Sequence, residues 1–276
     1  MIDLHVHTTA SDGRLTPFAL VDAARGAGLT IISITDHDTT AGYQSARAHA
    51  AGAGLELVPG VEISAVSGGR DVHVLGYFLD AASPSLHAFL DRQRADRLRR
   101  VAEMSDRLAR LGCPIDAGPV LAAAKTGRSV GRPQIAEALV SAGHVRTRSE
   151  AFDRFLEYGG AAYVPRQGAS PEEVVGIIHA AGGLASLAHP GVTDRDAVID
   201  RMVEAGLDAI EVRHADHDAA TESRYRRLAG ERGLLVTGGS DFHGTDEHRV
   251  SSLGLVTLPE EDYRAFRAAS ADHPGV

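Results

Sequence analysis

Short runs of β-branched and other apolar residues alternate along this chain with longer stretches whose apolar residues recur at helical spacing. The short runs, which are typical of buried strands, cover residues 1–7, 30–36, 55–64, 71–79, 183–189, 207–214, 234–240 and 251–258. Helical spacing is found at 16–27, 41–53, 170–181, 193–205 and 216–231. Because strand and helix alternate, the pattern predicts an α/β protein with a parallel sheet or barrel. The pair Gly68-Gly69 predicts a tight hairpin between the third and fourth strands.

The alternation stops between residues 81 and 165, where we find no strand pattern. Apolar residues there follow helical spacing in four stretches, 84–111, 116–125, 132–142 and 148–158. We therefore expect residues 1–80 and 166–276 to form the barrel. Residues 81–165 are expected to form an all-helical insertion between its fourth and fifth strands, acting as a cap that selects the substrate.

Side chains that can bind metal ions gather where the predicted strands end. They are His5, His7 and Asp12 after the first strand, Asp36, His37 and Asp38 after the second, Glu62 on the third, His73 on the fourth, His189 after the fifth, and Asp241 and His243 after 234–240. The carboxyl ends of barrel strands converge on one rim, and side chains two residues apart on a strand point the same way. A single histidine is usually a hydrogen-bonded core residue, whereas this many at successive strand ends predict a metal site. Imidazole and carboxylate ligands suit Mn²⁺, Fe²⁺ or Zn²⁺.

Composition excludes several classes of function. The chain has 276 residues, 43% of them hydrophobic, which suits one large domain or a domain with an insertion. Its one cysteine, Cys113, excludes an intrachain disulfide and a thiolate metal cluster. A net charge of −9 argues against binding to duplex DNA or anionic lipid, and no apolar run approaches the roughly 20 residues of a membrane-spanning helix. The charged Asp3 argues against a secretory leader, so we expect a cytoplasmic protein.

Six sequence motifs together resemble those of the PHP (polymerase and histidinol phosphatase) family. They are DLHVHTTASDG at 3–13, TDHDT at 35–39, GVEIS at 60–64, HVLGY at 73–77, AHP at 188–190 and GSDFH at 239–243, in the family's order. Members of this family are metal-dependent phosphoesterases with a distorted (β/α)7 TIM-like barrel. The resemblance therefore implies this α/β fold, with the helical insertion added, and the hydrolysis of phosphate esters.

The resemblance also implies three divalent ions in one cluster, with Mn²⁺ expected first and Fe²⁺ or Zn²⁺ as alternatives. The first ion would be held by His5, His7, Glu62 and Asp241, the second by Asp12, His37 and His243, and the third by His73, His189 and the bridging Glu62. The resemblance also implies catalytic roles for four of these residues, Asp12, His37, Glu62 and His243. Three such ions exceed the charge of the three carboxylates by about +3, so the site attracts a phosphate dianion and activates a water molecule as nucleophile. No covalent intermediate is then needed.

Arginines in the insertion are candidates for binding a second phosphate. Arg97 lies within the apolar stripe of 84–111 and Arg100 at its edge, where an arginine is costly unless an anion pairs with it. For these two, snorkelling or an ion pair with an aspartate explains the position equally well. Arg132 precedes Pro133 at a predicted helix start, whose free N–H groups favour phosphate. The segment HADHD at 214–218 is expected to be a solvated helix start.

Within the family, the chain is most similar to a branch that has a helical insertion at this place. That branch includes 3′,5′-nucleoside bisphosphate phosphatases, which remove the 3′-phosphate of pAp-like compounds, and related members that trim the 5′ ends of short RNAs. The expected substrate is therefore a small phosphorylated nucleotide or short single-stranded RNA. One alternative is a histidinol-phosphate or other small-molecule phosphomonoesterase, which would not need several insertion arginines. The other is a non-catalytic PHP scaffold, although this chain keeps all nine predicted ligands.

Overall fold

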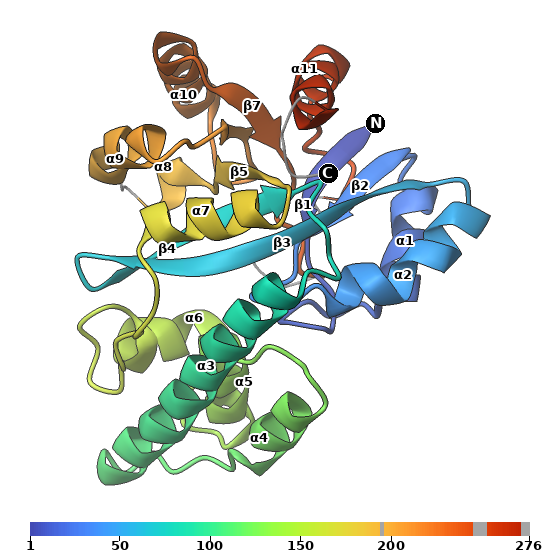
Figure 1. The fold of residues 1–276 in the computed structure, drawn as a ribbon. Helices are drawn as coiled ribbons and strands as arrows, with labels where there is room; N and C mark the ends of the chain where they lie inside the picture. Colours follow the sequence, from blue (N-terminus) through green and yellow to red (C-terminus); the bar gives the residue numbers. More distant parts are fainter. Residues whose placement is uncertain (194–195, 245–252, 272–276) are drawn as a thin grey trace.

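Seven strands form one curved sheet in the computed structural model of this protein, which describes residues 1–193, 196–244 and 253–271 (Figure 1). The strands are β1 (Ile2–Val6), β2 (Ile31–Ile34), β3 (Glu56–Ser67), β4 (Arg70–Tyr77), β5 (Leu184–Leu187), β6 (Ala209–Arg213) and β7 (Leu235–Gly238). Neighbours in the sheet follow the order of the chain. The segment after β7 returns to β1, since the His7 N–H donates to the Phe242 carbonyl oxygen at 2.8 Å. The predicted barrel is therefore confirmed, in a nearly closed form.

Strand direction changes at β4. The pairs β1–β2, β2–β3, β5–β6 and β6–β7 are parallel, whereas β4 is antiparallel to both β3 and β5. The cause is the predicted hairpin, in which Gly68 and Gly69 have φ values of 58° and 75° and join Ser67 to its partner Arg70. Such a two-residue turn requires antiparallel strands, because a parallel pair needs a long crossover. The hairpin is confirmed, and an entirely parallel sheet is wrong.

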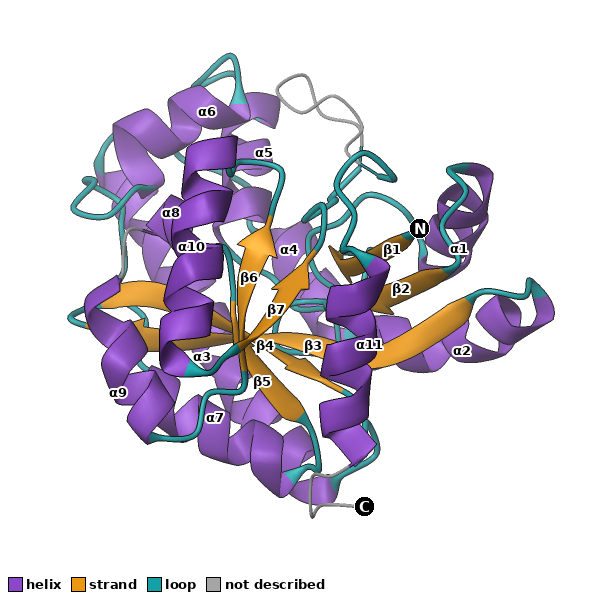
Figure 2. Ribbon diagram, turned by 90° about the horizontal axis from the view of Figure 1, so that it is seen from above, coloured by secondary structure: helices purple, strands orange, loops and turns teal. Residues whose placement is uncertain are grey.

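Helices cover the outside of the barrel (Figure 2). They are α1 (Pro17–Gly26), α2 (Ala41–Gly52), α7 (Pro171–Ala180), α8 (Pro190–Thr193), the 3₁₀ helix η2 (Asp196–Val198), α9 (Ile199–Glu204), α10 (Ala219–Arg232) and α11 (Glu260–Ala271). At the start of α7, the Ser170 hydroxyl accepts the Glu173 N–H while the Glu173 carboxylate accepts the Ser170 N–H. The single helix expected at 193–205 is divided among α8, η2 and α9. No helix within the described ranges is long and apolar enough to cross a membrane.

The C-terminal part of the barrel differs from the prediction. The strand expected at 251–258 is wrong for residues 253–258, which form turns and loop, and residues 251–252 lie outside the described part of the chain. The Leu258 N–H instead donates to the Ile2 carbonyl oxygen at 2.9 Å, beside the outer end of β1. Helix α11, which the sequence pattern did not predict, then packs Phe266 edge-on against Tyr77, with ring centroids 5.3 Å apart. Apolar residues at 253–258 thus anchor a loop and a helix rather than an eighth strand.

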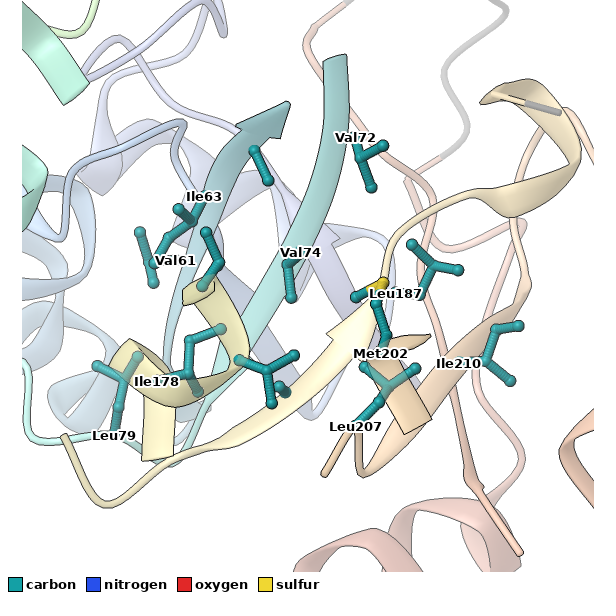
Figure 3. Packing of buried hydrophobic residues seen from close by; sticks show 14 of the residues in the cluster. Val61, Ile63, Val72, Val74, Leu79, Ile178, Leu187, Met202, Leu207 and Ile210 are labelled. Carbon is teal, nitrogen blue, oxygen red and sulfur yellow. The ribbon is translucent and has the colours of Figure 1, made fainter. Parts of the chain in front are cut away.

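The largest apolar cluster lies between β3–β6 and the helices outside them (Figure 3). Val61 and Ile63 of β3 belong to this cluster together with Val74 of β4. Because neighbouring residues on a strand point to opposite faces, packing these residues outward turns Glu62 and His73 toward the inside of the barrel. The core therefore sets the direction of two side chains that the sequence singled out.

Residues 81–165 form helices joined by loops and contain no strand, as predicted. The segment contains α3 (Pro84–Arg110), α4 (Gly118–Lys125), α5 (Arg132–Ser141), α6 (Arg148–Ala151) and the π-helical turn η1 (Phe152–Leu156). These helices lie on one side of the barrel around an apolar cluster of their own (Figure 1). Helix α3 joins the two cores, because Leu90 packs against the barrel and Met104 against the other helices. Between these positions, the buried face of α3 presents Arg97 and Arg100.

Candidate metal centre

The structure brings all nine predicted metal ligands together at one end of the barrel. They come from β1 and the loop after it (His5, His7, Asp12), the loop after β2 (His37), β3 (Glu62), β4 (His73), the loop after β5 (His189) and the loop after β7 (Asp241, His243). Three overlapping groups have ligand atoms within 4.8 Å of one another: His7, Asp12, His37 and His243; His5, His7 and Asp241; and His37, Glu62 and His73. The convergence follows from the barrel, whose strand ends meet at one rim.

The Glu62 carboxylate lies at the centre of this arrangement. Its Oε2 is 3.5 Å from Nε2 of His5 and 3.3 Å from Nε2 of His7. Its Oε1 is 2.7 Å from Nδ1 of His73 and 3.1 Å from Nε2 of His189. Glu62 is only 1% exposed. Oε2 also lies 2.9 Å from Nδ1 of His37, so its two oxygens face different sets of histidines, and the carboxylate could be shared between cations.

Two aspartates complete the set. Asp241 Oδ1 lies 3.3 Å from Nε2 of His5 and 3.1 Å from Nε2 of His7. Asp12 lies farther along the rim, with Oδ2 3.6 Å from Nε2 of His37 and Oδ1 3.3 Å from Nε2 of His243. The two groups overlap, because Asp12 also lies 3.8 Å from Nδ1 of His7 and Asp241 3.5 Å from Nδ1 of His243. The division of these ligands among separate ions therefore stays a prediction.

Unsatisfied polar atoms show that these side chains suit divalent cations. Buried atoms without a hydrogen-bond partner include Nε2 of His5, both ring nitrogens of His7, Nδ1 of His37 and Oε2 of Glu62. Buried polar atoms are nearly always paired, so lone pairs that converge in this way need cations between them. All the atoms concerned are nitrogen or oxygen, which fits the preferences of Mn²⁺, Fe²⁺ and Zn²⁺. The residues present therefore fit a metal centre.

The pKa values of the histidines agree with this conclusion. Burial opposes the protonation of His7, but the carboxylates of Asp241 and Glu62 outweigh it and raise the pKa to about 10. Burial, with a smaller effect from Arg97, lowers the pKa of His37 to about 4 against the attraction of Glu62 and Asp12. The buried carboxylates thus need compensating positive charge, which protons on the histidines supply when no metal ion is bound. Metal binding would release those protons.

Backbone strain is concentrated around the centre. Among the non-glycine residues that the structure describes, φ is positive at Asp38 (52°), Phe78 (57°), His189 (28°) and Asp241 (51°). Such conformations cost about 1–3 kcal/mol each and persist where surrounding contacts impose them. For Asp38, its N–H donates to the Glu62 carbonyl oxygen at 2.8 Å and its Oδ1 accepts the Ser64 N–H at 2.9 Å. Three of the four strained residues are ligands or adjoin one, so the rim is held in shape by its hydrogen bonds.

Asp36, which the sequence grouped with the metal-competent residues, has a different role. Its Oδ1 accepts the Thr8 N–H at 2.8 Å and the Ser11 hydroxyl at 2.7 Å. Its Oδ2 accepts the Thr8 hydroxyl at 2.7 Å. The carboxylate is therefore occupied by the loop that carries Asp12, and Asp36 fixes that loop.

The prediction of a solvated helix start at 214–218 is wrong for its two histidines. Asp218 does begin α10, since its Oδ1 accepts the Thr221 N–H at 2.8 Å. His214 and His217, however, are buried, with 2% and 7% of their surface exposed. His214 Nδ1 accepts the Asp216 N–H at 3.1 Å, so Nε2 carries the proton, and this atom lies 3.4 Å from Asp241 Oδ2. His214 follows a strand as the predicted ligands do, and this position was the signal that could have identified it.

Arg97 forms a buried ion pair beside the centre. Its Nε donates to Asp38 Oδ2 at 2.5 Å and its Nη2 donates to the Ser64 hydroxyl at 2.7 Å. A second cation, Arg166, places Nη1 3.8 Å from the same carboxylate. Burial opposes the ionisation of Asp38, but the two arginines outweigh it and lower its pKa. Arg97 therefore does form an ion pair, as one alternative expected, but its partner is the distant Asp38 and not a neighbouring aspartate of the helix.

A second carboxylate, Asp71 on β4, gathers three arginines. Its Oδ2 lies 3.1 Å from Nη2 of Arg132 and 4.0 Å from Nη2 of Arg100, and its Oδ1 lies 3.4 Å from Nε of Arg166. Although burial opposes ionisation, these cations hold the pKa of Asp71 well below its usual value. Nη2 of Arg100 and Nη1 of Arg166 are buried without a hydrogen-bond partner. Sequence reasoning missed Arg166, which comes from the loop after the helical segment.

A pocket of about 420 Å³ joins the metal centre to this arginine cluster. It is lined by His73 and His189 from the centre and by Asp71 and Arg132 from the cluster. Three aromatic side chains, Phe152, Tyr158 and Tyr163, also line it, and the rest of the lining comes from Arg70, Glu157, Val192 and Thr193. A concave site of this size, with aromatic walls and several charged groups, suits a small charged ligand. A ligand there would contact predicted metal ligands and an arginine at the same time.

Comparison with known proteins identifies the family. The family model for the PHP domain matches residues 3–141. The chain is 36% identical to a 3′,5′-nucleoside bisphosphate phosphatase of Chromobacterium violaceum, over 89% of this chain and 88% of that protein. It is 37% identical to the 5′-3′ exoribonuclease Rnm of Salmonella typhimurium, over 87% and 84%. A crystal structure from Bifidobacterium adolescentis, provisionally assigned as a metal-dependent phosphoesterase, superposes with a TM-score of 0.87 at 37% identity, covering 97% of this chain and 95% of that one. The chain therefore belongs to the PHP domain family.

Proposed function

We propose that this protein hydrolyses the 3′-phosphate of 3′,5′-nucleoside bisphosphates and trims the 5′ ends of short single-stranded RNA. The main support is the pocket, which is lined by two predicted metal ligands, by Arg132 and by aromatic side chains. A nucleotide with two phosphates needs cations at the phosphate that is cleaved and a guanidinium at the one that is kept. The C. violaceum and S. typhimurium relatives are named for these two activities, which supports the same substrate class.

We propose that three divalent ions occupy the centre and that Mn²⁺ is the preferred metal. The proposed ligand sets are His5, His7, Glu62 and Asp241 for the first ion, Asp12, His37 and His243 for the second, and Glu62, His73 and His189 for the third. When bound, such ions lower the pKa of a coordinated water and stabilise charge on phosphoryl oxygens. The residues expected to be closest to the reaction are Asp12, His37, Glu62 and His243. Because His37 has a pKa of about 4, its ring is neutral near pH 7 and keeps a lone pair for a cation.

The arginine cluster is proposed to bind the phosphate that is not cleaved. Arg97, Arg100, Arg132 and Arg166 face the two carboxylates of Asp38 and Asp71, so the cluster keeps a net charge of about +2, which matches a phosphate dianion. Arg132 lines the pocket and is 26% exposed, so it is placed for direct contact. The unpartnered nitrogens of Arg100 and Arg166 lie behind it and add positive potential. Arg97 is held by Asp38, so its contribution is through charge.

The aromatic wall is proposed to hold the nucleoside. Tyr158 and Tyr163 lie edge-to-face with centroids 5.5 Å apart, and the Arg70 guanidinium lies 4.4 Å from the centre of the Tyr158 ring. Tyr158 is 54% exposed and lines the pocket, so its ring is accessible to a ligand. Stacking of a base on such a ring contributes about 1–3 kcal/mol and tolerates any base. Single-stranded substrates can present an unstacked base, which duplex DNA does not.

A substrate panel with Mn²⁺ tests this proposal. We expect pAp or a short 5′-phosphorylated RNA to exceed the 2′,5′ isomer of pAp and histidinol phosphate by at least about tenfold in kcat/KM, which corresponds to about 1.4 kcal/mol. Equal rates across the panel would remove the substrate assignment and leave the phosphoesterase. Preference for histidinol phosphate would favour the monophosphatase alternative, in which Arg132→Ala costs little. Failure of every substrate with Mn²⁺, Fe²⁺ or Zn²⁺ present would favour the scaffold alternative.

A further inference from the structure

Glu211 is a buried carboxylate on β6 that none of the predicted ligand sets contains. It is fully buried, and both of its oxygens contact residues of the metal centre. Oε1 lies 2.9 Å from Nδ1 of His5, and Oε2 accepts the His189 N–H at 2.8 Å. His5 lies on β1 and His189 in the loop after β5, and the two face opposite oxygens of Glu62. The Glu211 side chain therefore contacts one histidine on each side of Glu62.

The contact with His5 fixes which ring nitrogen carries the proton. His5 Nε2 faces Glu62 and Asp241 at 3.5 and 3.3 Å and has no hydrogen-bond partner. To offer a lone pair at Nε2, a neutral imidazole must carry its proton on Nδ1. A carboxylate at Nδ1 accepts that proton's hydrogen bond and stabilises this tautomer.

The contact with His189 stabilises a strained backbone. His189 has a φ of 28°, in the left-handed region that residues with a Cβ rarely adopt. Its N–H donates to Glu211, while its Nε2 reaches Glu62 Oε1 at 3.1 Å. Loss of the acceptor would leave a buried N–H unpaired and allow the loop to relax away from Glu62.

We infer that Glu211 is a positioning residue for the metal centre, which sets the His5 tautomer and holds the His189 loop in place. The inference rests on the proposed function only in that the centre binds cations. Glu211 does not itself need to contact a cation, because its two oxygens are already engaged.

Glu211→Gln tests both contacts at once, because no orientation of an amide serves both. With the amide oxygen toward the His189 N–H, the NH₂ group faces His5 Nδ1 and drives the proton to Nε2, the atom meant for the cation. With the amide turned over, its NH₂ group faces the His189 N–H, and two donors oppose each other. Glu211→Asp keeps the charge but is too short to reach both partners, so an intermediate effect is expected.

The chain offers a matched control at Asp208, the residue directly before β6. Asp208 Oδ2 lies 2.8 Å from His179 Nε2 and accepts the Ala185 N–H at 2.7 Å. It thus repeats the pairing of a carboxylate with one imidazole and one backbone N–H, but away from the centre. Asp208→Asn removes a similar set of hydrogen bonds without reaching any predicted ligand.

The experiment measures Mn²⁺ binding by the full chain, from the free Mn²⁺ signal in electron paramagnetic resonance and from metal content after gel filtration. We expect Glu211→Gln to weaken Mn²⁺ binding about 10- to 100-fold, which is the usual effect of losing a carboxylate that orients a metal ligand. Asp208→Asn should bind Mn²⁺ as the wild type does. In ¹⁵N-histidine spectra of the Zn²⁺-loaded chain, the His5 signal, identified by its loss in His5→Gln, should report a proton on Nδ1 only while Glu211 is present.

Four results would overturn the inference. One is wild-type Mn²⁺ affinity in Glu211→Gln, and another is an equal loss in Asp208→Asn, which would show a general effect of weakening the sheet. If Glu211→Gln does not fold, wild-type affinity in Glu211→Asp decides against the inference in the same way. A wild-type chain that binds no Mn²⁺ would overturn the proposed function as well, so the two failures are distinguishable.

Discussion

Replacing Arg132 by alanine tests whether the pocket recognises a second phosphate. Arg132 lines the pocket, is partly exposed and has Nη2 3.1 Å from Asp71. A guanidinium can form two charge-assisted hydrogen bonds with a phosphate, each contributing about 1.5–3 kcal/mol. One of them replaces the existing contact with Asp71, while Arg100 and Arg166 remain in the variant. We therefore expect a net loss of about 2–3 kcal/mol, or about 30- to 150-fold in kcat/KM for pAp.

The assay compares two substrates as well as two proteins. Adenosine 3′-monophosphate lacks the 5′-phosphate of pAp but keeps the phosphate that is cleaved. If Arg132 binds the 5′-phosphate, Arg132→Ala should change kcat/KM for the monophosphate by less than about threefold. Arg132→Lys keeps the charge but not the planar fork, so it should recover only part of the loss for pAp. Arg92→Ala, which removes an exposed arginine of α3, serves as the control.

An equal loss on both substrates would refute the reasoning. In that case Arg132 would act on the cleaved phosphate or on the structure of the pocket, because a contact with the 5′-phosphate cannot affect a substrate that lacks it. An unchanged kcat/KM for both substrates would remove Arg132 from the site and favour a monophosphatase.

Three further predictions concern metal and stability. Chelation should abolish hydrolysis of every phosphate ester, and added Mn²⁺ should restore it and raise the melting temperature; turnover that persists after chelation would contradict a metal-dependent reaction. Arg97→Met should lower the free energy of unfolding by about 3 kcal/mol in urea titrations, because Asp38 stays buried with Arg166 3.8 Å away; a loss below about 1 kcal/mol would show that the pair contributes little. Burial and a 2.6 Å hydrogen bond to Glu56 raise the pKa of Tyr263, so its stabilisation is complete below the ordinary tyrosine pKa of 10.0 and is lost as the pH rises above it. Tyr263→Phe should thus be less stable than wild type by about 1 kcal/mol at pH 7, with the difference closing above pH 10; a constant difference would argue against this assignment.

Most of the barrel and the centre follows from local patterns in the sequence. Alternation in β3 turns Val61 and Ile63 outward, and the same alternation turns Glu62 inward. The spacing of His5 and His7 places two imidazoles on one side of β1 in the same way. Because such patterns depend only on strand geometry, they identify ligands without knowledge of tertiary contacts. The cytoplasmic location and the roles of individual site residues stay predictions.

What the sequence did not predict depends on contacts between distant residues. The arginine partner Asp71 and the additional Arg166 are 95 positions apart, and no periodicity links them. The buried state of His214 depends on its contact with Asp241, which comes from another strand end. At 251–258 the apolar residues resemble a strand, yet Leu258 packs as part of a loop because α11 follows it. The local sequence pattern indicates which residues are buried, whereas the tertiary fold determines which residues a buried group contacts.

The two carboxylates that hold the arginines also link the arginine cluster to the metal centre. Asp38 directly follows His37, and Asp71 lies two residues before His73 on β4. Each arginine-binding carboxylate therefore shares a short, well-packed piece of backbone with a predicted metal ligand. The distance between the cations and the arginine cluster is then fixed by a few covalent bonds rather than by the packing of two separate units. Under the proposed function, such a site would select substrates by the separation of their two phosphates, because moving either binding group would displace the other.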